Sequence, residues 1–323
     1  MTAFIVRRTL WTVLVLFVIT VLVFLIFFAT PGVDPARQMA GRNPSAATIR
    51  QIKHEFGLDR ALPVQYAIMM KKMFVSRDLV SYTNRGLKVL PQVTSAAPVT
   101  FSLVLGAAVI WVVMSIVVGL GAAVLRGTIF DPLLMILSLI GISMPVFWLG
   151  EVANLVTQSR YHSSFLFSWL PPNGYTPLTQ DPVLWFKHLI IPWLVLSVLY
   201  IGFYARVLRS NLVEIQNEDY IRTARAKGLS ERRVLLRHTL RTSMITFVSL
   251  FGLDFGALVA GGALLTEVVF GLPGVGLLTY HSLTGLDLPV IMVTVVYGAI
   301  FIVLANALVD VAYAWLDPRI RPA

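Results

Sequence analysis

The chain has 323 residues, of which 57% are hydrophobic and 13% are charged, and it carries a formal net charge of +10. Because soluble domains carry about 25% charged residues, this composition excludes a soluble protein and indicates an integral membrane protein. An excess of Lys and Arg is typical of the cytoplasmic loops of such proteins, so the charge predicts no nucleic-acid partner.

Six apolar stretches are long enough to form membrane-spanning helices, each of which needs roughly 20 residues. The first follows Arg7 and Arg8 and lacks a small-residue cleavage site, so we expect an uncleaved span. The sequence therefore predicts an all-α integral membrane protein with six transmembrane helices. In chain order the predicted spans are Thr9–Phe28, Phe101–Leu125, 132–157, His188–Tyr204, Ser243–Thr266 and Leu288–Trp315.

Basic residues set the predicted orientation, since six spans place both termini on the same side. Arg126, the 206–241 loop and the terminal Arg residues share that side, which is cytoplasmic by the positive-inside rule. One segment does not follow this rule. Residues 31–98 are placed outside the cytoplasm although they hold ten Lys and Arg against four acids. The rule weakens for loops longer than about 60 residues, so we still expect a multi-pass protein with both termini cytoplasmic.

The outer segment 31–98 is expected to form helices of its own. Ser45 can cap a helix that runs to about Phe56 and ends at Gly57. Pro63 can open a second helix. The predicted parts are a first transmembrane helix (1–30), this extracytoplasmic segment (31–98), a five-helix transmembrane domain (99–316) and a cytoplasmic tail (317–323).

A strongly basic segment stands between the predicted fourth and fifth spans. Its sequence, DYIRTARAKGLSERRVLLRHTLR (Asp219–Arg241), has eight Arg, Lys and His residues and two acids. Asn217 can cap a helix over Glu218–Lys227. Gly228 can end that helix, and Ser230 can cap a second one. A folded, charged hairpin of this kind favours docking of a partner, and a solvated loop that contacts only lipid headgroups is the alternative.

Small residues in this segment favour the docking interpretation. Ala224 and Ala226 reduce the steric bulk beside Gly228, which would allow a partner surface to approach closely. The basic side chains around them could pair with acidic groups on that partner. The spacing Ala-x-Ala-x-Gly, together with two helix caps, therefore predicts a docking loop.

Six stretches follow one another in a family-specific order along nearly the whole chain. They are ATPGVDPARQMAG, FGLDRALPVQY, GISMPVFWLG, DYIRTARAKGLSERRVLLRH, TEVVFGLPGVGLL and ALVDVAYAWLDPRIR. Together they resemble the membrane permease subunits of dipeptide and oligopeptide ABC importers, the peptide-permease type of the binding-protein-dependent transport family. The fourth is similar to the EAA loop of that family, with Ala224 and Gly228 at the second Ala and the Gly of the motif.

The chain departs from this family's pattern at several positions. Arg222 and Thr223 stand where the general motif has Glu and Ala, a variant that peptide permeases commonly carry. In the outer segment, Arg77 and Val80 replace glycines of the family. Asp254 stands where the family often has an uncharged amide.

The resemblance implies a type I ABC importer permease fold in the cytoplasmic membrane of a prokaryote. The partners it implies, besides the lipid bilayer, are a homologous second permease subunit, two ATPase subunits and an extracytoplasmic substrate-binding protein. ATP and Mg would bind the ATPase subunits, because this chain has no GxxxxGK[ST] motif. We therefore expect a transport subunit that is not an enzyme and binds no cofactor itself.

In such permeases the loop at about 210–242 lies in a groove of one ATPase subunit and couples ATP binding to movement of the spans. The residues expected to form this ATPase-coupling loop are Asp219, Tyr220, Arg222, Thr223, Ala224, Ala226, Lys227, Gly228, Arg232 and Arg233.

Three residues in or near the spans are candidates for the translocation path or its gate. Asp254 lies among glycines of span five, where a carboxylate either faces a cavity and attracts a peptide amino group or makes an interhelical hydrogen bond. Glu267, at the outer end of span five, could shape an outer gate or could be an interfacial carboxylate exposed to water. Pro145 is expected to kink span three.

The function we expect is ATP-driven import of dipeptides or oligopeptides. A permease for nickel or another small solute is the nearest alternative, since nickel permeases share these motifs. A proton-coupled secondary transporter using Asp254 and Glu151 would not need the docking loop, and the lack of an inverted repeat argues against it.

A membrane enzyme finds no support in the sequence. Neither a zinc motif nor a nucleophile elbow is present. The chain has no Cys and only five scattered His residues, so no thiolate chemistry and no metal site are predicted.

Overall fold

The computed structural model of the chain describes residues 2–28, 36–37, 45–84 and 86–316. Within these residues every named element is a helix, and the one strand-like pairing is an isolated antiparallel bridge between Val80 and Lys88. The prediction of an all-α membrane protein is therefore confirmed. The predicted tail, 317–323, and most of the ATPGVDPARQMAG stretch lie outside the described residues.

Four helical stretches among the described residues are long and apolar enough to cross a membrane. They correspond to the predicted second, fourth, fifth and sixth spans. They are α5 (Val89–Val124), α8 (Pro182–Ile215), the run Glu231–Gly262, and α14 (Leu288–Leu316), which passes the test over Leu288–Ala307. The predicted first span corresponds to α1 (Thr2–Phe28), whose apolar stretch Leu10–Ile26 is shorter.

The run Glu231–Gly262 is built from four successive elements. They are α10 (Glu231–Arg233), η3 (Val234–Thr239), α11 (Leu240–Ala257) and η4 (Leu258–Gly262). The π-helical segments η3 and η4 therefore flank α11 on both sides.

Two further helix pairs are apolar enough to span a membrane together but are sharply bent. α6 (Phe130–Ser143) meets α7 (Val146–Asn154), which continues as η2 (Leu155–Arg160), at 92°. α12 (Leu264–Phe270) meets α13 (Val275–Gly285) at 88°. Counting each pair as one span raises the number of candidate spans in the described chain to six.

The predicted limits of three spans were wrong. α5 begins at Val89, well before Phe101, and runs through the predicted domain boundary at residue 98. α8 continues past Tyr204 to Ile215, because the charge of Arg209 near its end is paired inside the molecule. The fifth span ends near Gly261, whose φ of 132° lies outside the helical region, and not at Thr266.

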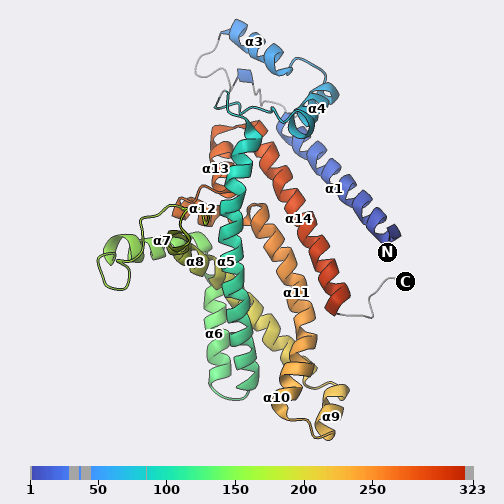
Figure 1. The fold of residues 1–323 in the computed structure, drawn as a ribbon, viewed down its shortest axis with the longest axis vertical. Helices are drawn as coiled ribbons and strands as arrows, with labels where there is room; N and C mark the ends of the chain where they lie inside the picture. Colours follow the sequence, from blue (N-terminus) through green and yellow to red (C-terminus); the bar gives the residue numbers. More distant parts are fainter. Residues whose placement is uncertain (1, 29–35, 38–44, 85, 317–323) are drawn as a thin grey trace.

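The helices pack as two neighbouring groups, which meet where α8 of one group contacts α11 of the other (Figure 1). α8 lies against α5 and α6, whereas α14 lies against α11 and α1. The core between the groups holds the fully buried side chains Trp111, Tyr204 and Phe247. The outer segment and α13 lie at one end of the molecule, and α9 (Asp219–Ala226) and α10 lie at the opposite end (Figure 1).

Glycines bring α8 close to α5 and α6. A Cβ added at Gly119 of α5 would lie 2.8 Å from the carbonyl oxygen of Ala205, and one added at Gly202 of α8 would overlap the carbonyl oxygen of Ser138 on α6. The three helices therefore pack with their backbones in near contact. We call them the α5–α6–α8 block.

The outer segment contains the helices that the sequence predicts. α3 (Ala46–Phe56) is capped by Ser45, whose side chain accepts a hydrogen bond from Thr48 N–H at 3.1 Å, and it ends at Gly57 with a φ of 69°. Pro63 lies in the first turn of α4 (Leu62–Met70), which continues as η1 (Lys71–Val75).

Candidate functional site

The basic segment between α8 and α11 forms a short helical hairpin. Glu218 has an extended backbone and occupies the N-cap position of α9 without a side-chain capping hydrogen bond, and Gly228, with a φ of 78°, follows the last turn. Ser230 stands at the N-cap of α10, as predicted. The predicted cap at Asn217 was wrong, because the Asn217 side chain turns back and donates to the Val213 carbonyl at 3.1 Å.

A small apolar core holds this hairpin together. Ile221, Ala224 and Val234 are buried against one another, with Ile215 and Leu229 packed beside them. Ala224 therefore faces into the hairpin, and the expectation that it lowers steric bulk at the outer surface was wrong. Its small size is needed inside, where a longer side chain would push α9 away from η3.

Ala226 and Gly228 are exposed. No atom lies within 4 Å of a Cβ built on Gly228, so open space surrounds this position. The requirement for glycine comes from its backbone conformation, which other residues rarely adopt. These two residues, unlike Ala224, leave a surface that another molecule could approach closely.

The charges of the hairpin fall into two classes. Arg225 binds Glu231 through two hydrogen bonds, of 2.8 and 3.3 Å, and also donates to the Gln216 carbonyl, so it is used within the loop. The side chains of Lys227, Arg232 and Arg233 are exposed and make no hydrogen bond or ion pair with another described residue. They form the cationic surface of the hairpin.

Polar residues on α9 complete this surface. Asp219, Tyr220, Arg222 and Thr223 are all exposed. Asp219 and Arg222 face each other at 3.4 Å, a weak surface contact. The Tyr220 hydroxyl donates to Thr242 at 3.3 Å and so links α9 to the start of α11.

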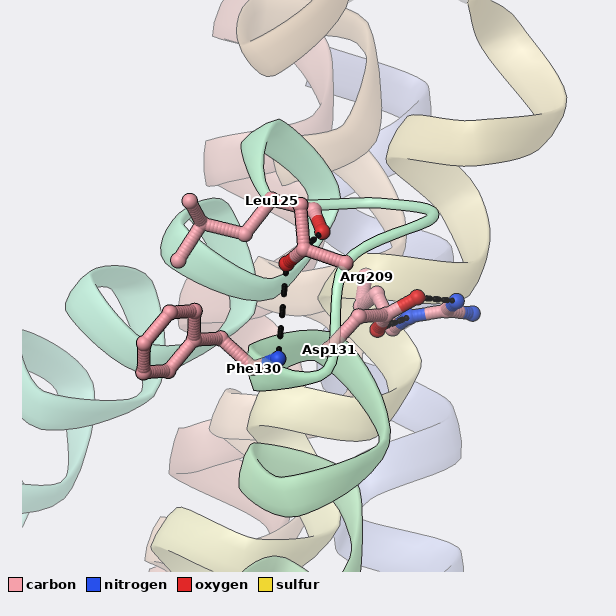
Figure 2. Close-up of polar contacts among 5 residues, drawn as sticks. Leu125, Phe130, Asp131 and Arg209 are labelled. Atoms are coloured by element: carbon pink, nitrogen blue, oxygen red, sulfur yellow. Dashed lines mark hydrogen bonds and ion pairs between the residues drawn. The ribbon is translucent and has the colours of Figure 1, made fainter.

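An ion pair fixes the end of α8 that leads into the hairpin. Asp131, in the first turn of α6, accepts hydrogen bonds of 2.6 and 2.5 Å from Nε and Nη2 of Arg209 on α8. Figure 2 shows the carboxylate and the guanidinium facing each other with two parallel bonds. This bidentate geometry is strong and directional, and it ties α8 to the turn between α5 and α6.

That turn has its own hydrogen bonds. The Thr128 hydroxyl donates to the Leu125 carbonyl at 2.7 Å and accepts from Phe130 N–H at 3.3 Å (Figure 2). The end of α5 and the start of α6 are therefore held together beside the ion pair. This anchor was not predicted, although an isolated Asp131 at the start of an apolar stretch indicates that the position is functional or paired.

Pro145 separates two helices. Its backbone is extended, with φ −61° and ψ 131°, and it occupies the N-cap of α7. The predicted kink is in fact a complete break, because the chain turns by 92° here. Pro145 lacks the N–H that a continuous helix would need and disfavours the helical conformation in the residue before it.

Asp254 forms the interhelical hydrogen bond that the sequence analysis named as one of two alternatives. The hydroxyl of Tyr204 on α8 donates to Asp254 Oδ2 on α11 at 2.6 Å. Tyr204 is fully buried, whereas Asp254 is partly exposed.

Glu267 is fully buried, so its interpretation as a water-exposed interfacial carboxylate was wrong. Thr100 on α5 donates to Oε1 at 2.6 Å, and Leu277 N–H on α13 donates to Oε2 at 2.9 Å. Thr100 Oγ1 in turn accepts from Val275 N–H at 2.8 Å. One carboxylate thus joins α12, α13 and α5.

The glycines of the TEVVFGLPGVGLL stretch make room for this carboxylate. A Cβ on Gly274 would overlap the Glu267 carboxyl group, and one on Gly276 would lie 3.0 Å from Oε2. The motif therefore encodes a buried acceptor together with the space that surrounds it. Asn154 of α7 adds a further link, since its side chain donates to the Val269 carbonyl of α12 at 3.0 Å.

Two family models match the chain. One, described as "Binding-protein-dependent transport system inner membrane component", matches residues 115–322. The other describes the N-terminal part of the membrane component of the same systems and matches residues 1–104. The two matches together cover almost the whole sequence.

Several named relatives match over nearly their full length. The oligopeptide transport system permease protein AppB of Bacillus subtilis is 34% identical over 323 residues, which cover 99% of this chain and 100% of that protein. The probable D,D-dipeptide transport system permease protein DdpB of Escherichia coli is 36% identical, with 98% and 97% covered. The dipeptide transport system permease protein DppB of Alkalihalophilus pseudofirmus is 30% identical, with 99% and 100% covered.

Among solved structures, a chain of the inward-facing MetNI methionine ABC transporter is similar in fold. The TM-score is 0.56 at 18% sequence identity, and the match covers 71% of this chain and 97% of that chain. At this identity the likeness shows a shared fold alone.

Proposed function

This chain belongs to the family of inner membrane components of binding-protein-dependent transport systems, and from that premise we propose that it is the permease subunit of an ATP-driven importer of peptides. It is a multi-pass protein of the bacterial inner membrane. The observation that carries the peptide assignment is the full-length identity of 30–36% to three permeases named for oligopeptide or dipeptide transport.

A binding-protein-dependent system implies ATPase and binding-protein partners. We propose that two ATPase subunits, which hold ATP and Mg, dock on the cytoplasmic side and that a homologous second permease subunit completes the membrane domain. An extracytoplasmic binding protein would deliver the solute on the outer side. The helical hairpin and the outer segment lie at opposite ends of the molecule, as this arrangement requires (Figure 1).

The proposed topology has six spans, both termini in the cytoplasm and the 31–98 segment outside. The chain has no native cysteine, so single cysteines can report the topology directly. Val75→Cys, at an outer position that is 72% exposed, should react with an impermeant maleimide added to intact cells. Lys227→Cys should react only after the membrane is permeabilised, and reaction of both from outside would contradict the topology.

The hairpin is the proposed contact with an ATPase subunit. Its support is the combination of a self-contained apolar core with a cationic surface that no described residue neutralises. A hairpin with its own core can move as a unit, and α8 connects it directly to the α5–α6–α8 block. ATP-driven movement of the hairpin would therefore be passed to the spans.

Glu267 and Pro145 are the proposed gate elements. Glu267 holds the α12–α13 bend, and Pro145 marks the α6–α7 bend; α7 and α12 pack against each other. Each of the two contacting helices, α7 and α12, therefore adjoins a right-angle bend, and together they form the proposed hinge region. We propose that these elements rearrange when the cavity switches access.

The test is uptake by the complete complex, purified with its partner subunits and binding protein and reconstituted in vesicles. Labelled dipeptide, a longer peptide and nickel are offered in parallel, with and without ATP. ATP-dependent uptake of a peptide is the expected result. Uptake of nickel alone would keep the architecture and overturn the peptide assignment in favour of the small-solute alternative.

A further inference from the structure

The carboxylate of Asp254 lies deep within the membrane domain. It is 13 residues beyond Arg241, which corresponds to about 20 Å along a helix at 1.5 Å per residue. The hydrocarbon core of a bilayer is about 30 Å thick. Asp254 is also the one charged residue between Arg241 and Glu267. A charge at this depth is costly unless it has a partner or faces water.

The hydrogen bond from Tyr204 satisfies only part of this carboxylate. The Tyr204 hydroxyl binds Oδ2 at 2.6 Å. Oδ1 receives no hydrogen bond from any described residue, and no Lys, Arg or His among them pairs with Asp254. Since an ionised carboxylate accepts several hydrogen bonds, one face of the group is left for another donor.

Aromatic rings from α5, α8 and α11 pack around Tyr204, which donates to this carboxylate. Trp111 of α5 stacks on Tyr200 of α8 with ring centroids 4.7 Å apart. Trp111 also contacts Phe251 of α11 at 5.5 Å, one helical turn before Asp254. Trp111 is fully buried, whereas Tyr200 and Phe251 are partly exposed, as Asp254 is. The accessible part of the cluster therefore consists of one carboxylate and two aromatic rings.

This combination fits one chemical class of ligand. Aromatic faces attract an organic cation, and a carboxylate in a surrounding of low polarity attracts it far more strongly than in water. A phosphate or carboxylate would be repelled. A neutral apolar group would gain nothing from the unpaired Oδ1.

We propose that Asp254, Tyr200 and Phe251 form a subsite for the protonated amino group of a solute passing through the membrane domain. Tyr204 acts as a positioning residue that orients the carboxylate from its buried side. The inference rests on the proposed peptide transport, because a peptide carries such a group at its N-terminus or on a Lys side chain. It adds a specificity element within the membrane to the selection made by the binding protein.

The test compares Asp254→Asn with the unaltered chain in the reconstituted complex. Asn can still accept the Tyr204 hydrogen bond but carries no charge. Three peptides of equal length are offered: one with Lys, one with norleucine in its place, and the norleucine peptide with an acetylated N-terminus. For each peptide the ratio of variant to unaltered uptake is taken, so that the preference of the binding protein cancels.

We expect Asp254→Asn to lower initial uptake of a cationic peptide at least about tenfold relative to its neutral counterpart. A fall for the Lys peptide relative to norleucine assigns the subsite to side-chain cations. A fall for the free N-terminus relative to the acetylated one assigns it to the N-terminal ammonium. Equal ratios for all three peptides would overturn the subsite and leave Asp254 as a helix-packing residue.

Three further variants keep the result interpretable. Asp254→Glu keeps the charge and should keep the preference for cations even if its overall rate falls. Tyr204→Phe removes the hydrogen bond without changing charge and should reduce the preference less than Asp254→Asn does. Glu151→Gln alters an exposed carboxylate of α7 that makes no side-chain hydrogen bond with described residues, and it should change none of the ratios.

The outcome for the subsite is separate from that for the proposed function. If the unaltered complex imports none of the peptides, peptide transport is contradicted, and the subsite falls with it because it rests on that function. If it imports all three and Asp254→Asn changes them equally, peptide transport stands and the subsite is rejected.

Discussion

Asp131 and Arg209 are joined by two parallel hydrogen bonds that connect the turn between α5 and α6 to the end of α8. The Asp131 side chain is 9% exposed and that of Arg209 is 27% exposed, so water does not replace either partner fully. The pair lies where α8 leaves the α5–α6–α8 block toward the hairpin. It therefore keeps the base of the proposed coupling loop in a fixed relation to two other spans.

Breaking this pair should weaken both stability and coupling. Asp131→Ala leaves the Arg209 guanidinium without its acceptor, and we expect a loss of about 1–3 kcal/mol in stability together with lower uptake per ATP hydrolysed. Thermal unfolding of the purified complex and the ratio of uptake to ATPase rate measure the two effects. The double exchange Asp131→Arg with Arg209→Asp should recover part of both, and no recovery would argue against a direct pairwise role.

Charge reversal on the exposed face of the hairpin should uncouple the ATPase without unfolding the chain. Lys227→Glu with Arg232→Glu and Arg233→Glu changes side chains that contact no other charged group among the described residues. We expect co-purification of the ATPase and uptake to fall more than tenfold while the chain stays in the membrane. The matched control is Arg50→Glu on the exposed face of α3, which should leave ATPase binding unchanged.

Gly274→Ala should disturb the bend between α12 and α13. The added methyl group would overlap the Glu267 carboxyl group, and overpacking of this kind costs about 1–3 kcal/mol. A lower unfolding temperature and faster proteolysis within 264–285 would report it. Gly121→Ala on α5, where the methyl group meets nothing within 4 Å, is the control and should be neutral or slightly stabilising.

Arg77 adopts a left-handed backbone conformation with a φ of 55°. A residue other than glycine loses about 1–2 kcal/mol by adopting this conformation. Arg77→Gly should therefore leave stability unchanged or raise it by up to about 1 kcal/mol, whereas Arg77→Val should lower it because β-branched residues fit this region poorly. The unfolding temperatures of the two variants should differ in that order; the reverse order would contradict it.

Asp287 fastens the outer segment to the membrane domain. It is buried between α13 and α14 and accepts hydrogen bonds from the Ser81 hydroxyl and, at 3.0 Å, from Tyr82 N–H. Asp287→Ala leaves these donors without an acceptor, and we expect a loss of about 1–3 kcal/mol with faster proteolysis of 45–88 in right-side-out vesicles. Asp181→Ala removes only an exposed helix cap at the start of α8 and should leave that proteolysis unchanged.

Much of this protein could be predicted from its sequence, because membrane insertion depends on the hydrophobicity and length of single stretches of the chain. Apolar length identified the helices, since each span must satisfy its backbone hydrogen bonds internally. Local geometry predicted the caps at Ser45 and Ser230 and the end of a helix at Gly228, because these depend on neighbours only a few residues away.

The predictions were wrong where a residue distant in the sequence changes the structure that a local pattern indicates. Arg206 suggested the end of span four, but α8 continues to Ile215, and Arg209 within this extension finds its partner, Asp131, on α6. Asn217 has the residue type of a cap, yet Glu218 takes that position. Pro145 indicated a kink, whereas the chain turns by 92° there and α7 packs against α12.

The sequence alone thus determined the class of this protein, its helices and the candidate coupling loop, because hydrophobic length, charge and capping are properties of short stretches. Only the tertiary structure decided that Ala224 points inward, that Glu267 is buried against Thr100, and that Asp254 is held by Tyr204. The physical reason is that a buried polar group must find its partner in three dimensions. Those partners lie far apart along the chain, where no local pattern connects them.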